Sequence, residues 1–203
     1  ESFDLGFALA RHTGMQLYLA FALPYIAFAV LVNLLTWGSP LLALFIVWWA
    51  KPAFDRIALA VLSRAVFAET PAWKQTLNGI LKIPRTGLLY ALTFGRFDFA
   101  RSFHLAVFQL EGQTGGARRA RIRLLDRTAR GSAVWLSVVV IHFAYVLVFG
   151  FEGLLAMFAP KGTEFSIGIS TLFKDGGDAG LQGQYLFNLA FLLTECALEP
   201  IYV

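Results

Sequence analysis

Two long apolar runs constrain this chain more than any other feature. Residues 14–37 form a run of 24 without a charged side chain, and residues 131–160 form the clearest run of all. In a helix that rises about 1.5 Å per residue, the first run covers roughly 36 Å, which exceeds a hydrocarbon core of ~30 Å. Because 58% of the 203 residues are apolar and 15% are charged, the chain departs from soluble domains, which average about half and a quarter. The sequence therefore predicts an all-α, polytopic helical membrane protein.

We expect about four transmembrane helices in a single membrane domain covering residues 1–203. The run that starts at residue 41 is short, is interrupted by Lys51 and Pro52, and resumes after Arg56. It forms either one long helix bent at Pro52 or a spanning helix followed by an amphipathic surface helix, and the charges on one face favour the surface helix. The predicted spans are 14–37, 41–52, 131–160 and 181–203.

The placement of basic residues predicts which parts face the cytoplasm. Of the 17 Lys and Arg, 14 lie between Lys51 and Arg130, and cytoplasmic loops carry an excess of such residues. We therefore expect residues 53–130 to form a basic cytoplasmic and interfacial region with amphipathic helices. The N-terminus, with an amphipathic helix over 1–13, lies on the same side, and residues 161–180 form an external loop.

A second topology adds a hairpin inserted from residues 75–110, which would make six membrane-inserted helices. Its outer tip would carry Arg96, Asp98 and Arg101. Because this placement opposes the bias of basic residues toward the cytoplasm, four spans are favoured over six.

Two titratable side chains are expected deep in the membrane. His142 lies about ten residues into its run from the cytoplasmic end, and Glu195 about fourteen residues into the last run from the outer end. A lone ionised Glu at that depth costs at least ~2.5 kcal/mol, so it must be protonated, paired or hydrated. We hypothesise that His142 and Glu195 pair as a proton-linked or ligand-binding site. The structural alternative is a neutral Glu195 that hydrogen-bonds to a neighbouring helix.

A further group of charges is expected at the inner helix ends. Glu199 precedes Pro200 near the end of the last run, and Lys51, Asp55 and Arg56 lie at the same predicted level on another helix. We expect an ion pair between these helix ends, with a structural rather than a catalytic role.

An Arg cluster lies directly before the run over 131–160. Because juxtamembrane Arg attracts anionic lipid at roughly 1 kcal/mol each, this position predicts contact with anionic phospholipids of the bilayer rather than with nucleic acid. The cluster consists of Arg118, Arg119, Arg121, Arg123, Arg127 and Arg130.

No pattern for catalysis stands out in this sequence. The glycines between Gly112 and Gly116 lack the Lys-Ser/Thr that completes a phosphate-binding loop, and the three His are far apart in the chain. We therefore expect no enzyme activity, no metal site and no cofactor.

Four stretches of the sequence are similar to one protein family: SFDLGFALARH, LFIVWWAKPAFDR, FARSFHLAVFQLEG followed by the Arg-rich segment, and LEPIYV. They resemble the membrane domain of proteobacterial inner-membrane proteins of unknown function, some of which carry a C-terminal domain of unknown function. The plan is more loosely similar to the membrane domain attached to some glycerophosphodiester phosphodiesterases. The resemblance implies a bacterial inner membrane. It transfers no catalytic residue, because the phosphodiesterase residues belong to a separate domain.

The resemblance also implies a longer protein, because in that family a further helical stretch and a basic tail follow the motif Glu-Pro-hydrophobic-Tyr-Val. The start at Glu1 and the apolar end at Val203 agree with this expectation.

Two functional hypotheses follow from these observations. The first is a structural, scaffolding or assembly role through the basic cytoplasmic face, in a homo-oligomer or a larger membrane complex. The alternative is a transporter or lipid-handling protein with a polar site near His142 and Glu195. The two differ in one structural expectation: Glu195 lies beside a cavity in the alternative and is enclosed by packed side chains in the first.

Overall fold

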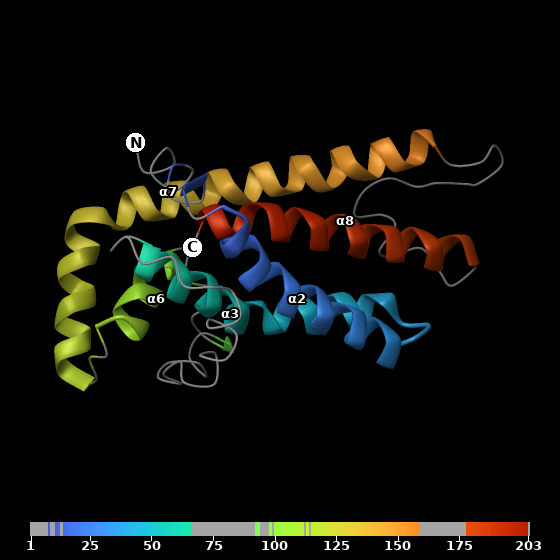
Figure 1. Cartoon of the computed structure of the whole chain (residues 1–203). Helices are drawn as coiled ribbons and strands as arrows, with labels where there is room; N and C mark the ends of the chain where they lie inside the picture. The colour runs from blue at the N-terminus through green and yellow to red at the C-terminus, as the bar shows by residue number, and fades with distance from the viewer. Residues whose placement is uncertain are drawn as a thin grey trace.

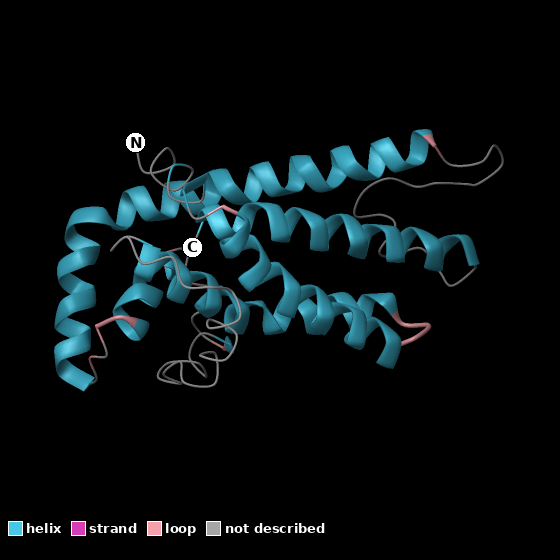
Figure 2. Cartoon of the chain, in the orientation of Figure 1, coloured by secondary structure: helices cyan, strands magenta, loops and turns pink. Residues whose placement is uncertain are grey.

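Helices make up all the regular structure in the described part of the chain (Figure 2). The computed structural model describes residues 8, 11–12, 14–65, 92–93, 98, 100–111, 113, 115–158 and 178–202. The all-α prediction is therefore confirmed for these residues. The helices are α2 (Met15–Leu35), α3 (Pro40–Ala65), α6 (Arg101–Gln109), α7 (Gly115–Met157) and α8 (Asp178–Tyr202) (Figure 1).

Two of the described helices, α2 and α7, are long and apolar enough to cross a membrane. They contain the two runs that the sequence marked most clearly. Most of the expected helix over 1–13, of the expected loop over 161–180 and of the basic region lies outside the described residues. The end of the expected loop is helical, because α8 begins at Asp178.

The helix α3 continues through Pro52, where the sequence favoured a break. It spans 26 residues as one helix. Asp55 has 0% of its surface exposed and Arg56 has 4%, so these charges face other helices and not a membrane surface. The surface-helix interpretation is therefore replaced by one long helix, because burial between helices outweighs the lost backbone hydrogen bond at Pro52.

A tight turn makes α2 and α3 an antiparallel pair. Gly38 has a φ of 86°, which suits a residue without a Cβ, and the N–H of Ser39 donates to the Thr36 carbonyl oxygen over 2.9 Å. Pro40 begins α3, where a helix has no partner for a backbone N–H anyway. The two helices share a buried cluster of Phe21, Tyr25, Ala29, Val32, Ala43, Val47 and Ala58.

The helix α7 joins the Arg cluster and the second apolar run in one element of 43 residues. The expected boundary at residue 131 is therefore not the end of a helix. Figure 1 shows instead that α7 bends sharply in its yellow stretch, so that its first part points away from its long gold and orange part. We call residues 115–130 the arm and residues 131–157 the long part.

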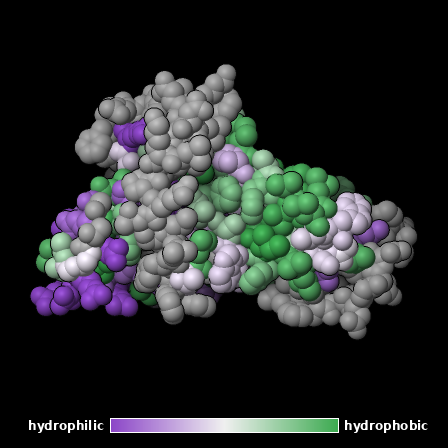
Figure 3. All heavy atoms as spheres, turned by 90° about the horizontal axis from the view of Figure 1, so that it is seen from below, coloured by the Kyte–Doolittle hydropathy of each residue, from purple (hydrophilic) through white to green (hydrophobic). Residues whose placement is uncertain are grey.

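The helix α8 lies between the long part of α7 and the α2–α3 pair (Figure 1). Val148 of α7 and Phe187 of α8 are both buried in one small apolar cluster. Apolar side chains of the long part such as Trp135 and Val146 are two-thirds exposed. In Figure 3, hydrophobic atoms cover the middle of the visible face and hydrophilic atoms gather at the end where the arm lies.

Candidate functional site

A buried ion-pair cluster connects α3 to α8. Lys51 Nζ lies 2.7 Å from Glu199 Oε2, and it also pairs with Glu195. The two glutamates are one helical turn apart, so both project to the same side of α8 and a single ammonium reaches both. An ion pair between these helix ends was expected, and the structure forms it between Lys51 and Glu199. Glu195, which the sequence placed at a different depth, belongs to the same cluster.

The other two candidates of the helix-end group, Asp55 and Arg56, differ in where they point. Asp55 follows Lys51 by one turn on α3 and is fully buried. Arg56 connects α3 to α6: its Nε donates to Gln109 Oε1 over 3.4 Å, and Gln109 Nε2 donates to the Arg56 carbonyl oxygen over 2.8 Å. Arg56 therefore positions α6 through this contact.

Tyr25 brings a third helix to the cluster. Its side chain is fully buried, and its ring packs against Phe21 and Phe54 with centroid distances of 5.5 Å and 5.2 Å. The hydroxyl has no hydrogen-bond partner among the described residues, and it lies within electrostatic reach of Lys51 and Glu195.

A cavity of about 310 Å³ lies beside the ion pair, between α3, α7 and α8. We call it the lateral cleft. One end is polar and includes Lys51, Asp98, Ser137, Thr194, Glu195 and Glu199. The remaining lining is Trp48, Val140, Ile141, Ala144, Tyr145, Val148, Phe187, Phe191 and Leu198.

The two ends of the lateral cleft follow from the antiparallel packing of α7 and α8. Ser137 lies at the polar end, and Val148 lies beside Phe187 at the apolar end. These two residues of α7 are eleven positions apart, which corresponds to about 16 Å along the helix. The lateral cleft therefore has the length and the polarity gradient of a site for an amphiphile.

His142 is not part of this site. Its side chain is exposed, and its ring N–H at Nδ1 donates to the Val138 carbonyl oxygen of its own helix over 2.8 Å. The neighbouring Ile141 lines the lateral cleft, whereas His142 falls outside that stripe of α7. The structure therefore does not bring His142 to Glu195, because the rotation of α7 about its axis turns His142 away from α8.

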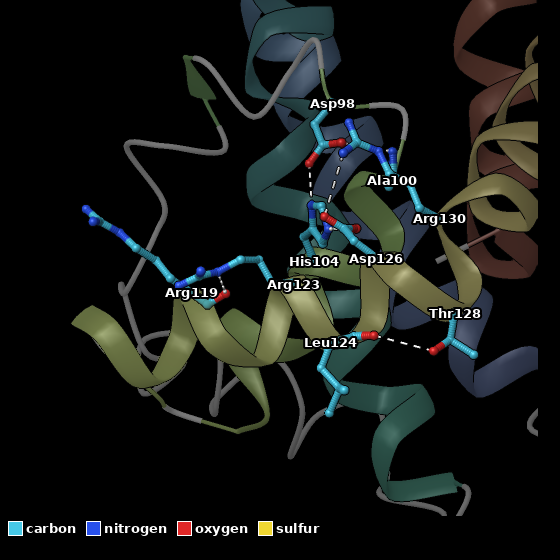
Figure 4. A network of polar contacts seen from close by, with 9 residues as sticks. All are labelled: Asp98, Ala100, His104, Arg119, Arg123, Leu124, Asp126, Thr128 and Arg130. Carbon is cyan, nitrogen blue, oxygen red and sulfur yellow. Dashed lines mark hydrogen bonds and ion pairs between the residues drawn. The ribbon is translucent and has the colours of Figure 1, made fainter.

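A second polar network, which sequence reasoning missed, holds the arm to α6 (Figure 4). His104 is 8% exposed, its Nδ1 contacts Asp98, and its Nε2 lies 3.0 Å from Asp126 Oδ1. Arg130 Nη1 lies 3.7 Å from the other oxygen of Asp126. These residues share no spacing motif, so only the fold brings them together.

The arginines of the arm divide into two groups. Some contact other residues: Arg121 Nε donates to Glu111 Oε1 over 2.9 Å, and the Arg118 guanidinium lies 4.6 Å from the Phe108 ring centroid. Arg119, Arg123 and Arg127 are exposed, as an anionic-lipid contact requires.

A second cavity of about 290 Å³ lies near the α2–α3 turn, and its lining includes Asn33, Trp37 and Asn188. Asn188 Nδ2 donates to the Pro40 carbonyl oxygen over 2.9 Å, and the Gly38 N–H donates to the Tyr185 hydroxyl oxygen over 3.1 Å. These contacts fasten α8 to the turn and leave the second cavity largely apolar.

Comparison with known proteins adds no assignment to this geometry. The chain matches no family model, and no curated protein and no solved structure is found to be similar to it. The resemblance to inner-membrane proteins stays a prediction. Within the described residues, no group of three or more His, Cys, Asp or Glu is arranged to hold a metal ion.

Proposed function

We propose that this chain is a multi-pass membrane protein that handles lipid, and that it binds a lipid-like molecule in the lateral cleft. One observation carries the proposal: Glu195 lines a cavity of about 310 Å³ and is not enclosed by packed side chains. This is the arrangement expected of a transporter or lipid-handling protein. It favours that alternative over a purely structural role.

The paired charges of α3 and α8 support the proposal that these two helices also cross the membrane. Together with α2 and α7 they make four spans. Both α3 and α8 carry charged residues near their middle or inner end, unlike α2. Lys51 of α3 pairs with Glu195 and Glu199 of α8, and ionisable residues inside a membrane are tolerated when they face the bundle and pair.

The arm supports an orientation with its arginines at the inner membrane surface. The bend of α7 separates the arm from the long part (Figure 1), and the exposed Arg119, Arg123 and Arg127 fit anionic phospholipid headgroups. With the N-terminus on the same side, the chain is a multi-pass protein of a bacterial inner membrane.

The lining of the lateral cleft supports a lipid as its occupant. The stripe from Val140 to Val148 on α7 and the two phenylalanines of α8 offer hydrocarbon to an acyl chain. Tyr145 and Ile141 are both lining residues and about half exposed. The lateral cleft is therefore open on the side of α7 that a surrounding bilayer would cover.

The proposal is tested by filling the apolar part of the lateral cleft with Ala144→Trp. The matched control is Val139→Trp, because Val139 lies on the same helix, is 52% exposed and does not line the lateral cleft. Native mass spectrometry of the purified full chain in detergent counts the lipid that stays bound. We expect retained lipid in the wild type and in Val139→Trp, and its loss in Ala144→Trp. Equal retention in both variants, or no retained lipid at all, contradicts the proposal.

A scaffolding role remains the second candidate, because the exposed arginines of the arm also suit an acidic partner protein. The scaffolding role is ruled out if the protein purifies in detergent as a monomer, without partner proteins, and still retains specific lipid.

A further inference from the structure

We infer that the second cavity binds an uncharged amphiphile through a hydroxyl headgroup, at a site separate from the lateral cleft. Its walls come from α2, α3 and α8, at the end of the molecule where the α2–α3 turn lies (Figure 1). Among the described residues that line it, none is acidic or basic. Besides the indole of Trp37, its polar side chains are the amides of Asn33 and Asn188 and the hydroxyl of Tyr185.

The amide oxygen of Asn188 is the observation that points to a ligand. Its Nδ2 donates to the Pro40 carbonyl oxygen over 2.9 Å, which fixes the orientation of the amide, because a carbonyl oxygen only accepts. Among the described residues, the buried Oδ1 has no hydrogen-bond partner, although most buried polar side-chain atoms have one. A hydroxyl of a ligand in the cavity that Asn188 lines would supply the missing donor.

Asn33 and Tyr185 complement the same kind of headgroup. Asn33 Nδ2 donates to the Ala29 carbonyl oxygen of its own helix over 2.8 Å, so its amide oxygen lies on the other side of the amide from that bond. The Tyr185 hydroxyl oxygen accepts from the Gly38 N–H over 3.1 Å, and a phenol also has a hydrogen to donate. A hydroxyl both donates and accepts, whereas an ether only accepts and an ammonium only donates.

The rest of the second cavity suits one hydrocarbon chain. Its volume of about 290 Å³ is close to the lower limit of roughly 300 Å³ for ligand pockets. Val30 and Leu34 of α2 line it and are more than half exposed, so the second cavity is open on the side of α2. A charged headgroup would lose its hydration there without gaining an ion pair.

The test uses photoactivatable single-chain probes and the purified full chain in detergent. Four probes share the chain and differ at its end: an alcohol, its methyl ether, a carboxylate and a primary ammonium. We expect the alcohol to cross-link to the α2 and α8 lining. We also expect it to bind about tenfold more tightly than the ether, which cannot donate to Asn188, and than the two charged probes.

Asn188→Leu removes the acceptor and keeps the apolar volume. It should lower the preference for the alcohol over the ether toward onefold while both probes still cross-link. The preference is a ratio within one variant, so the loss of the contact with Pro40 affects both probes alike. The matched control is Thr194→Val, a polar-to-apolar change on the same helix that lines the lateral cleft, and it should keep the tenfold preference.

A second pair of variants tests the place of binding from α2. Val30→Trp fills the second cavity from its exposed rim and should abolish the cross-links. Ile26→Trp is the matched control, because Ile26 lies one turn earlier on α2, is 38% exposed and lines neither cavity. It should leave the cross-links unchanged.

The hydroxyl headgroup has two sources, a long-chain alcohol and a monoacylglycerol. Competition of each, without a photoactivatable group, against the alcohol probe distinguishes them. The compound that displaces the probe at the lower concentration identifies the source.

The inference is overturned if the ether or a charged probe binds as well as the alcohol, since the cavity then accepts any hydrocarbon chain. Persistence of the preference in Asn188→Leu, or of the cross-links in Val30→Trp, overturns it as well. Ala144→Trp, which fills the lateral cleft, should leave these cross-links unchanged. The failure of this inference is therefore distinguishable from the failure of the proposed function.

Discussion

Lys51 neutralises carboxylates from two successive turns of α8, and this single contact explains why charged residues are compatible with these two helices. Its side chain is 17% exposed, and those of Glu195 and Glu199 are 12% and 4% exposed. Charges with so little access to water are stable when they are paired and very costly when they are not. Removing one charged partner should therefore destabilise the protein more than removing all three together.

Replacing Lys51 alone should be much more damaging than replacing the whole cluster. Lys51→Met leaves two buried carboxylates without their ammonium, and we expect a loss of about 3–5 kcal/mol in the free energy of unfolding. The triple variant Lys51→Met, Glu195→Gln and Glu199→Gln removes the charges together and should recover much of that loss. Thermal unfolding in detergent measures both. Additive losses across the three substitutions would show that the ion pairs do not couple these residues.

At the scale of elements, the arrangement of helices follows from a few local features. A turn over residues 36–39 reverses the chain between α2 and α3, and Gly38 takes a left-handed conformation there. The bend of α7 turns the arm away from the direction of the long part (Figure 1). His104 then fastens the arm to α6 through Asp126. Each device orients one helix, and together they leave the lateral cleft open between α7 and α3.

Gly38 and Gly150 provide a matched pair of substitutions for the turn. Gly38→Ala should lower the free energy of unfolding by roughly 1–2 kcal/mol, because a Cβ disfavours its φ of 86° although nothing lies within 4 Å of the added atom. Gly150→Ala, in the α7 helix and also with open space, should be neutral or stabilising by up to about 1 kcal/mol. Denaturation in mixed detergent compares the two. A stabilised Gly38→Ala protein would be inconsistent with the observed turn.

At the scale of the whole molecule, α8 connects the long part of α7 to the α2–α3 pair, since it contacts α2, α3 and α7. Both cavities have walls from α8, one near the α2–α3 turn and the other beside the ion pair. In a bilayer these cavities would lie toward opposite surfaces, because the turn and the arm are at opposite ends of the molecule (Figure 1). This polarity makes the proposed topology measurable.

Single-cysteine labelling should place the turn and the arm on opposite sides of the membrane. Cys196 is the only native cysteine, so Cys196→Ser provides a background for Gly38→Cys and, separately, Arg123→Cys. In sealed right-side-out vesicles, an impermeant maleimide should label the first variant only, and permeabilisation should expose the second. Labelling of both from the outside would refute the four-span topology.

The amino-acid sequence alone determined the helical character of the described chain and the two most apolar helices. Both are local properties: a continuous apolar run can satisfy its backbone polar groups within a membrane only by forming a helix. It also predicted an ion pair between Glu199 and the group of Lys51, Asp55 and Arg56, and the structure shows that Lys51 is the partner.

Only the tertiary structure decided how the helices are rotated and where they end. It placed Glu195 with Lys51 and not with His142, kept α3 intact through Pro52, and assembled Asp98, His104 and Asp126 from separate segments. The physical reason is that side-chain partners on different helices depend on interhelical packing, which residue spacing along one helix does not encode. The lateral cleft belongs to the same category, since it exists only between packed helices.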